Sequence, residues 1–202
     1  MHKSVIVVDD FLEQPDLLRR SATQQEYPKL KKAAFFPGRN SKHPQIINGY
    51  DQRISEIVGQ KLVRQTESAP YAKFRLALEG DTGTKGVHID NVEWTAILYL
   101  TLPEYCQDGT HLFRHIPTNT DRAPLTLEEC HSMGCNGFPD FWDTVLNPHT
   151  NDPSKWEKTL SIPMRYNRLV IIQAQQYHDA GLSFGTSIED GRLIYLTGYN
   201  SA

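Results

Sequence analysis

The stretch WTAILYLT, residues 94–101, sets the fold class, because strongly apolar side chains alternate along it with less apolar ones. Side chains of an extended strand point alternately to its two faces, so the stretch predicts a strand with two unlike faces. One face would carry Trp94, Ala96, Leu98 and Leu100, and the other Thr95, Ile97, Tyr99 and Thr101. The period of two indicates β structure rather than helix at this point of the chain.

Shorter runs with the same period lie on both sides of this stretch, at residues 74–78, 110–116, 168–173 and 192–199. Turn signals separate them, namely Gly80-Asp81, Asp108-Gly109 and Asp190-Gly191. Several short strands divided in this way predict an all-β sandwich or barrel. At 202 residues, the chain is long enough for one well-packed domain and short for two, so we expect a single domain over residues 1–202.

Over about residues 1–70, the sequence pattern predicts a helical part that packs outside the strands. A β-branched run at 4–8 precedes a predicted helix at about 14–25, where Pro15 suits the first turn and Asp16 the positive end of the helix dipole. Residues 36–49 are rich in Pro, Gly and Asn and predict a loop. An apolar stripe predicts a second helix at about 51–65.

Residues 117–163 lose the strand pattern and contain one helical candidate, at about 125–132. A segment this long inside one domain indicates a lid or a substrate-binding excursion. Trp142, Trp156, Phe138 and Phe141 lie in it and would either line a pocket or pack the lid.

Composition narrows the range of partners and compartments. A net charge of −3 gives no electrostatic reason to expect nucleic acid or an anionic membrane as partner. The chain has no apolar run of about 18 residues and no signal-peptide core at its start, so we expect no membrane span. Three cysteines, an odd number, argue against a disulfide framework and favour a cytoplasmic location. The oligomeric state is not readable from the sequence.

The candidate metal ligands are His88, Asp90 and His178. In an extended segment, His88 and Asp90 project to the same side, so one imidazole and one carboxylate can reach a single point. His178 follows the apolar run 169–172 and supplies a third ligand. Two histidines and one carboxylate on one face of a metal leave positions open for a cosubstrate and oxygen, an arrangement typical of non-haem iron(II) oxygenases.

The order of these motifs resembles the iron(II)/2-oxoglutarate oxygenase superfamily, especially its prolyl-hydroxylase-like branch. The matching segments are His88-Ile89-Asp90, Ile97-Leu98-Tyr99-Leu100-Thr101, Asp108-Gly109-Thr110-His111-Leu112-Phe113, Asn167-Arg168-Leu169-Val170-Ile171-Ile172, His178 and Gly191-Arg192-Leu193-Ile194. The opening Val7-Val8-Asp9-Asp10-Phe11-Leu12 is similar as well. The resemblance covers most of the chain apart from residues 117–163, and it extends to bacterial proteins of unassigned function.

This resemblance implies a double-stranded β-helix, or jelly roll, with His88, Asp90 and His178 as ligands of Fe(II). It implies that Arg192 pairs with the distal carboxylate of the cosubstrate 2-oxoglutarate and that Tyr99 donates a hydrogen bond to the same group. A planar, permanently charged guanidinium suits that role. The implied reaction is hydroxylation of a small-molecule or peptide substrate, with release of succinate and CO2. Family members that halogenate lack the carboxylate that Asp90 provides.

The chain also departs from the family pattern. The gap between Asp90 and His178 is long, Thr110 replaces the second glycine of the usual turn, and fourteen residues separate His178 from Arg192. Arg168 and either Lys73 or Arg75 are therefore alternative carboxylate partners.

Other patterns are weaker. Residues 181–185 match the G-x-S-x-G pattern of serine hydrolases, but a predicted loop follows where that motif needs a helix. His111 and His115 share a strand face and would bind substrate or form ordinary hydrogen bonds. Cys130, His131 and Cys135 are a poor match to a zinc site. Two further functions stay open: a cupin-type metal enzyme without 2-oxoglutarate, and a non-catalytic jelly roll that binds a sugar or a peptide.

Overall fold

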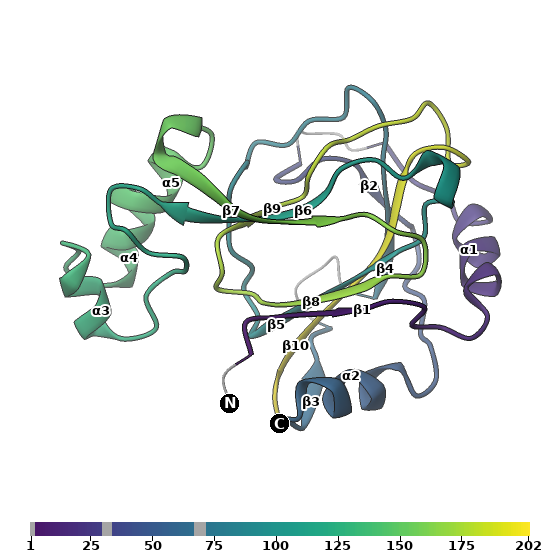
Figure 1. Cartoon of the computed structure of the whole chain (residues 1–202), viewed down its shortest axis with the longest axis horizontal. Coiled ribbons are helices and arrows are strands. Elements are labelled where there is room, and N and C mark those ends of the chain that lie inside the picture. Colours follow the sequence, from purple (N-terminus) through teal and green to yellow (C-terminus); the bar gives the residue numbers. More distant parts are fainter. Residues whose placement is uncertain (1–2, 30–33, 67–71) are drawn as a thin grey trace.

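The computed structural model describes residues 3–29, 34–66 and 72–202, which form two antiparallel sheets surrounded by short helices (Figure 1). The large sheet contains, in spatial order, β1 (Val5–Val8), β8 (Leu169–Gln173), β5 (Trp94–Tyr99), β10 (Arg192–Ser201), β4 (Lys73–Ala77) and β2 (Arg39–Asn40), and β3 (Leu62–Arg64) pairs with the far end of β10. The small sheet contains β7 (Trp156–Pro163), β6 (Gly109–His115) and β9 (His178–Asp179). The prediction of a mainly β fold is confirmed. Among the described residues, the two sheets do not close into one barrel.

The central strand β5 has the two faces that its alternation predicts. Leu98 belongs to an apolar cluster beneath the helices, whereas Ile97 and Tyr99 face a second cluster. This second cluster lies between the sheets, since it joins residues of β5, β8 and β10 to Leu112 of β6 and Ile162 of β7. Because both faces of β5 are covered, all six of its residues are buried.

Two N-terminal helices pack on the outer face of the large sheet. The helix α1 (Pro15–Thr23) matches its expected bounds within two residues, and α2 is Tyr50–Val58. The expected extension of the second helix to residue 65 is wrong. Gly59 takes a left-handed conformation, with φ of 80°, that ends the helix, and β3 follows. The helices lie at separate places around the sheet rather than in one continuous layer (Figure 1).

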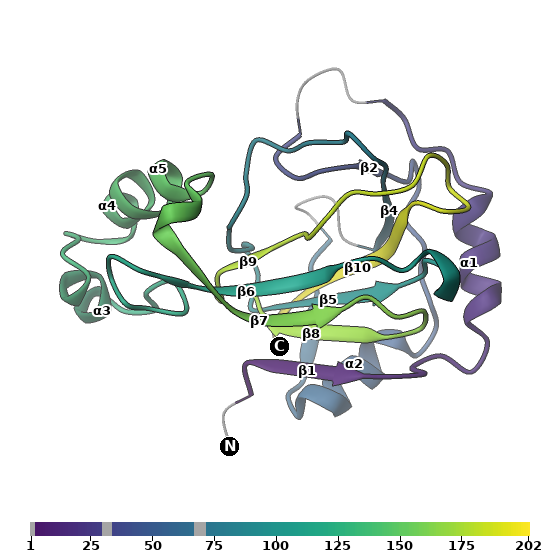
Figure 2. The same ribbon diagram turned by 45° about the horizontal axis from the view of Figure 1, so that its top comes forward.

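Most of the segment at residues 117–163, whose sequence lacks a strand pattern, forms a helical block at the end of the extended β6–β7 ribbon (Figure 2). It contains α3 (Leu127–Ser132), α4 (Phe138–Phe141), a π-helical turn (Trp142–Leu146) and α5 (Asn147–His149). Short 3-10 turns occur at Pro103–Tyr105 and Pro153–Lys155. The sequence pattern placed the end of this segment at residue 163, which is wrong, because residues 156–163 form strand β7. We call residues 117–155 the helical excursion.

Because the outer face of the large sheet is buried to different degrees, shortening a side chain is expected to lower the free energy of unfolding by different amounts in two neighbouring strands. Ile171 of β8 is fully buried, so Ile171→Ala is expected to lower the free energy of unfolding by about 2–5 kcal/mol. Val7 of the neighbouring strand β1 is 44% exposed, so Val7→Ala is expected to cost less than about 1 kcal/mol. Urea unfolding of both variants measures the two values, and equal losses would contradict this packing.

Candidate metal centre

Two hydrogen bonds between residues 88 and 178 bring the candidate ligands together. The His88 amide donates to the His178 carbonyl at 2.8 Å, and the His178 amide donates to the His88 carbonyl at 3.0 Å. This antiparallel pair places the two side chains on the same side of the backbone, with ring centroids 4.3 Å apart. Asp90 lies two residues further along the same extended segment, where its amide donates to Ala174.

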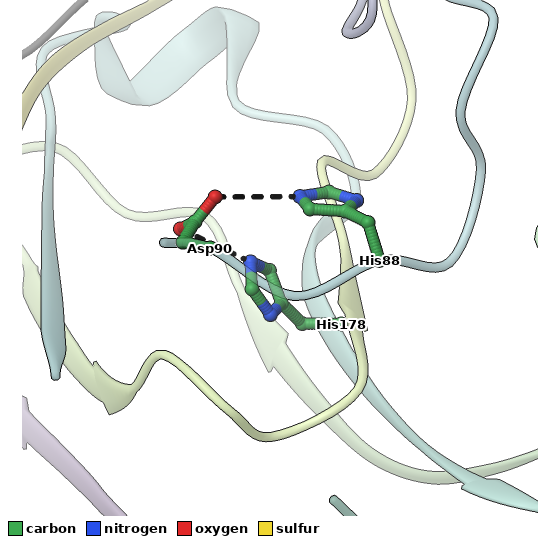
Figure 3. A group of neighbouring side chains, drawn as sticks. All are labelled: His88, Asp90 and His178. Carbon is green, nitrogen blue, oxygen red and sulfur yellow. Dashed lines mark ion pairs between the residues drawn. The ribbon is translucent and has the colours of Figure 1, made fainter. Parts of the chain in front are cut away.

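The three side chains converge on one point (Figure 3). His88 Nε2 lies 4.0 Å from Asp90 Oδ1, and His178 Nε2 lies 3.5 Å from Asp90 Oδ2. One ligand atom from each residue lies within 4.8 Å of the others. Among the described residues, this is the one group of three or more His, Cys, Asp or Glu side chains close enough to hold a metal ion.

Backbone carbonyls fix the orientation of both imidazoles. His88 Nδ1 lies 2.8 Å from the Gly86 carbonyl oxygen, and His178 Nδ1 lies 2.8 Å from that of Gln176. A carbonyl oxygen can only accept, so each Nδ1 carries a hydrogen, and the Nε2 of each ring, which faces Asp90, is the atom left to bind a metal or a further proton. Metal-binding histidines are typically held in this way by a bond at their other nitrogen.

The protonation states also suit metal binding. Burial and the neighbouring His178 lower the pKa of His88 to about 3, which keeps this ring neutral. Burial opposes ionisation of Asp90, but hydrogen bonding from His178 and the charges of both rings hold its pKa below the usual value. Burial opposes protonation of His178, but Asp90 raises its pKa overall. A bound metal cation would displace the proton that this interaction with Asp90 favours on His178 Nε2.

Arg192 begins strand β10 and is only 3% exposed. Within the described residues, its Nε has no hydrogen-bond partner and its guanidinium forms no ion pair. Burial lowers its pKa, yet arginine remains charged at neutral pH. A buried cation without an ion pair is costly, and Asp179 and Asp108 act on Arg192 only from a distance, so an anion from outside the chain would stabilise it. Tyr99, the other predicted cosubstrate residue, is fully buried and bonds Thr110 Oγ1 at 2.7 Å.

A second buried arginine lies near the centre. Arg75 of β4 donates from Nε to Asn40, and its guanidinium lies 5.7 Å from the Phe36 ring centroid. The Phe36 ring is in turn 4.1 Å from the ring of His88. Burial and the charge of Arg192 lower the pKa of Arg75 to about 10, so it remains charged at neutral pH.

The other alternative carboxylate partners lie elsewhere. Arg168 pairs with Asp9 at 2.6 Å, and the Lys73 ammonium donates to the Lys42 carbonyl. Their charges are already engaged at other places in the fold, which leaves Arg192 and Arg75 as the candidate carboxylate partners.

Sequence reasoning did not single out Thr95 for the site. Its hydroxyl donates to Asp90 Oδ2 at 2.6 Å and fixes the orientation of that carboxylate. The alternation of residues 94–101 places Thr95 on the same face as Tyr99, and that was the available signal.

The donor set fits a divalent first-row metal such as Fe(II). It combines two neutral imidazole nitrogens with one ionised carboxylate, all largely buried, and the sulfur ligands that favour structural zinc are absent from this group.

The matching family is described as "Family of unknown function (DUF6445)", and the match covers residues 1–194. The chain belongs to this family. No curated protein matches the sequence.

Two solved structures share the fold of this DUF6445 member. HygX from Streptomyces hygroscopicus, with nickel, 2-oxoglutarate and hygromycin B bound, has 11% sequence identity and a TM-score of 0.53, covering 98% of this chain and 83% of that one. The non-heme alpha ketoglutarate dependent epimerase SnoN from nogalamycin biosynthesis has 15% identity and a TM-score of 0.55, covering 98% and 79%. At these identities the likeness is one of fold.

The remaining candidates take part in ordinary structural contacts. His111 lies between Asp108 and Asp179, at 2.8 Å and 2.9 Å, and His115 bonds His149 and stacks on it. The residues of the G-x-S-x-G match lie in a loop without a following helix, so the hydrolase interpretation is wrong. Cys130 and Cys135 are buried as free thiols in an apolar cluster. No helix in the described ranges has the length and apolar character needed to cross a membrane.

The buried His115 predicts a pH-dependent stability. Burial and the neighbouring His149 lower the pKa of His115 to about 4. An unfolded histidine titrates near about 6.5, so between these values the unfolded chain binds a proton that the folded chain does not. The contribution of His115 to stability is therefore expected to fall as the pH drops from about 6.5 to about 4.

Urea unfolding at about pH 7 and about pH 5 measures this effect in the wild type and in His115→Phe. The variant should lose less stability between the two pH values than the wild type. An equal loss in both proteins would mean that His115 does not titrate as described.

Proposed function

We propose that this protein is an Fe(II)- and 2-oxoglutarate-dependent oxygenase that hydroxylates a small-molecule or peptide substrate and releases succinate and CO2. The observation that carries the proposal is the pairing of two elements in one interior. A buried group of two imidazoles and one carboxylate is tied through Asp90 to Thr95, which shares the inner face of β5 with Tyr99. Arg192, a buried arginine without an ion pair among the described residues, shares a face of β10 with Ile194, which packs in the same interior. The first fits the metal, and the second calls for an anion such as a cosubstrate carboxylate.

We further propose that the sheets form a double-stranded β-helix. In support, the large sheet has neighbouring strands in the order β8, β5, β10 and β4, and the small sheet that faces it has the order β7, β6 and β9. The bridge between His88 and His178 of β9 adds a fourth segment to the small sheet. Residues 1–202 would form a single domain, with about residues 1–70 as its outer helical part and the helical excursion as a lid. Membership of the prolyl-hydroxylase-like branch stays a prediction.

In the proposed mechanism O2 is the oxidant, and Fe(II) and 2-oxoglutarate, when bound, would supply the chemistry that activates it. His88, Asp90 and His178 hold the metal, and Thr95 keeps the Asp90 carboxylate in place through its hydroxyl. Arg192 binds the distal carboxylate of 2-oxoglutarate and so orients the cosubstrate.

Tyr99 can assist Arg192 in this role. A hydroxyl group has one donor and two acceptor sites, so if Thr110 donates to Tyr99, the tyrosine hydrogen is free for the same carboxylate. The apolar residues between the sheets exclude water from this interior.

A cupin-type metal enzyme and a non-catalytic binding jelly roll are the alternative functions. Neither explains why a buried arginine without a partner lies in the same interior as the metal ligands. A cytoplasmic location, and the absence of nucleic-acid and membrane partners, stay predictions from composition.

Anaerobic titration with Fe(II) and 2-oxoglutarate tests the proposal. Chelation of the metal by the cosubstrate should give a weak visible absorption band in the wild type. Arg192→Met should weaken 2-oxoglutarate binding by about 100-fold, because it removes charge-assisted hydrogen bonds worth roughly 3 kcal/mol in total.

The matched control is Arg168→Met, which breaks the ion pair with Asp9 and should leave the band unchanged. Absence of the band in the wild type would contradict the proposed function, and a normal titration of Arg192→Met would favour the cupin-type alternative.

The bond from Thr95 to Asp90 predicts a separate effect on the metal. Thr95→Val keeps the shape of the side chain but removes the hydroxyl, and we expect a 10- to 100-fold loss of Fe(II) affinity in anaerobic calorimetry. Thr159→Val on strand β7 is the control, since it removes a comparable hydroxyl bond, to the carbonyl of Leu112 on β6. Equal affinities of the two variants would show that Thr95 does not position the ligand.

A further inference from the structure

A pocket of about 330 Å³ opens beside the candidate metal centre. Its lining includes His88 and Asp90 and two further groups of residues, which we call its walls: Phe35 and Phe36 form one, and residues of the helical excursion form the other. The remaining lining residues are Lys85, Val87, Ile89, Asn91, Trp142, Leu146, Asn147 and Thr150. The volume is at the lower end of the range for small-molecule sites, which is about 300–1,000 Å³.

Both walls of the pocket are attached to the segment that leads into His88. The Lys85 amide donates to the Phe35 carbonyl at 2.9 Å. On the other side, the Val87 amide donates to the Thr150 carbonyl at 2.9 Å, and the Thr150 hydroxyl donates back to the Val87 carbonyl at 2.7 Å. The walls therefore hold fixed positions relative to His88.

The walls present aromatic surface to the pocket. Phe36 stacks against His88, while Phe35 and Trp142 remain 68% and 41% exposed. Trp142 begins the π-helical turn of the excursion, and such turns are rare and frequently occur at functional sites. Exposed aromatic side chains around a pocket favour a planar, apolar ligand group, because rings stack on one another and shed water.

The charges near the pocket favour an anion. Lys85 is the cationic residue of the lining, and its ammonium, which has three donors, makes one hydrogen bond within the described residues, to Asn147 at 2.7 Å. Two of its donors are therefore available to an anionic group of a ligand in the pocket.

We propose that this pocket is the substrate site of the enzyme and that its substrate is a small molecule with a planar apolar body and a carboxylate. The body lies between Phe35, Phe36 and Trp142, and the carboxylate pairs with Lys85. This inference rests on the proposed oxygenase function, since it places the substrate beside His88 and Asp90.

Three matched probes test the proposal by anaerobic calorimetry on the full chain, with Fe(II) and 2-oxoglutarate and also without them. The probes are 3-phenylpropanoate, its uncharged amide 3-phenylpropanamide, and butanoate, which lacks the ring. The phenylpropanoate should bind at least about tenfold more tightly than either of the others, because each lacks one of the two recognised groups. Equal affinities, or no binding of any probe, would overturn the proposal.

Variants locate the two contacts. Lys85→Gln should weaken phenylpropanoate binding about tenfold and leave phenylpropanamide unchanged, whereas Trp142→Leu should weaken both ring-bearing probes about fivefold and leave butanoate unchanged. Lys158→Gln, at an exposed position of β7, is the control and should change none of these affinities. If Lys85→Gln and Lys158→Gln behave alike, the assignment of the carboxylate contact is wrong.

The visible band separates this inference from the proposed function. A band with Fe(II) and 2-oxoglutarate, together with no selective probe binding, would overturn the substrate class alone. Selective probe binding without any band would overturn the oxygenase function and leave an aromatic carboxylate site in place.

Discussion

The backbone pairing of residues 88 and 178 is the interaction on which the candidate site depends. Two hydrogen bonds join an irregular segment after β4 to a two-residue strand near the end of the chain. Since the side chains of such a pair lie on one side of the backbone, both Nε2 atoms face the Asp90 carboxylate. The carbonyls of Gly86 and Gln176, two residues before each histidine, then fix the rings. A slip of one residue in this pairing would turn one imidazole out of the site.

Charge is the second constraint on this interior. Burying an arginine is unfavourable unless an anion balances it. Here Arg75 lies within reach of the Asp90 carboxylate, and Arg192 lies within reach of Asp179 and Asp108 but forms no ion pair with any described residue. A protein built only for stability would replace such groups with apolar side chains. Their retention agrees with a site that is completed by a metal, a dicarboxylate cosubstrate and an anionic substrate, each of which contributes to the final balance.

Sequence reasoning predicted the parts of the fold in which local pattern and burial agree. Strand β5 was predictable because both its faces are covered, whereas β7 was missed because only Trp156 and Ile162 of its eight residues are buried. The second helix was extended past Gly59 because the apolar spacing continues beyond the residue that ends it. His88, Asp90 and His178 could be predicted as ligands from their residue types and from the order of the motifs around them. The role of Thr95 depends on a contact that forms only after folding. Arg75 could be predicted only as one of several alternative carboxylate partners, because the sequence does not show which of these cations is buried.

The proposed function depends on one metal ion that is bound by three side chains from distant parts of the chain. A crystal structure grown anaerobically with Mn(II), as a less oxidisable substitute for Fe(II), and 2-oxoglutarate tests this most directly. The account predicts an ion bonded to Nε2 of His88, Nε2 of His178 and a carboxylate oxygen of Asp90, with the distal carboxylate of 2-oxoglutarate on Arg192. An ion bound elsewhere, or a cosubstrate that does not contact Arg192, would contradict it.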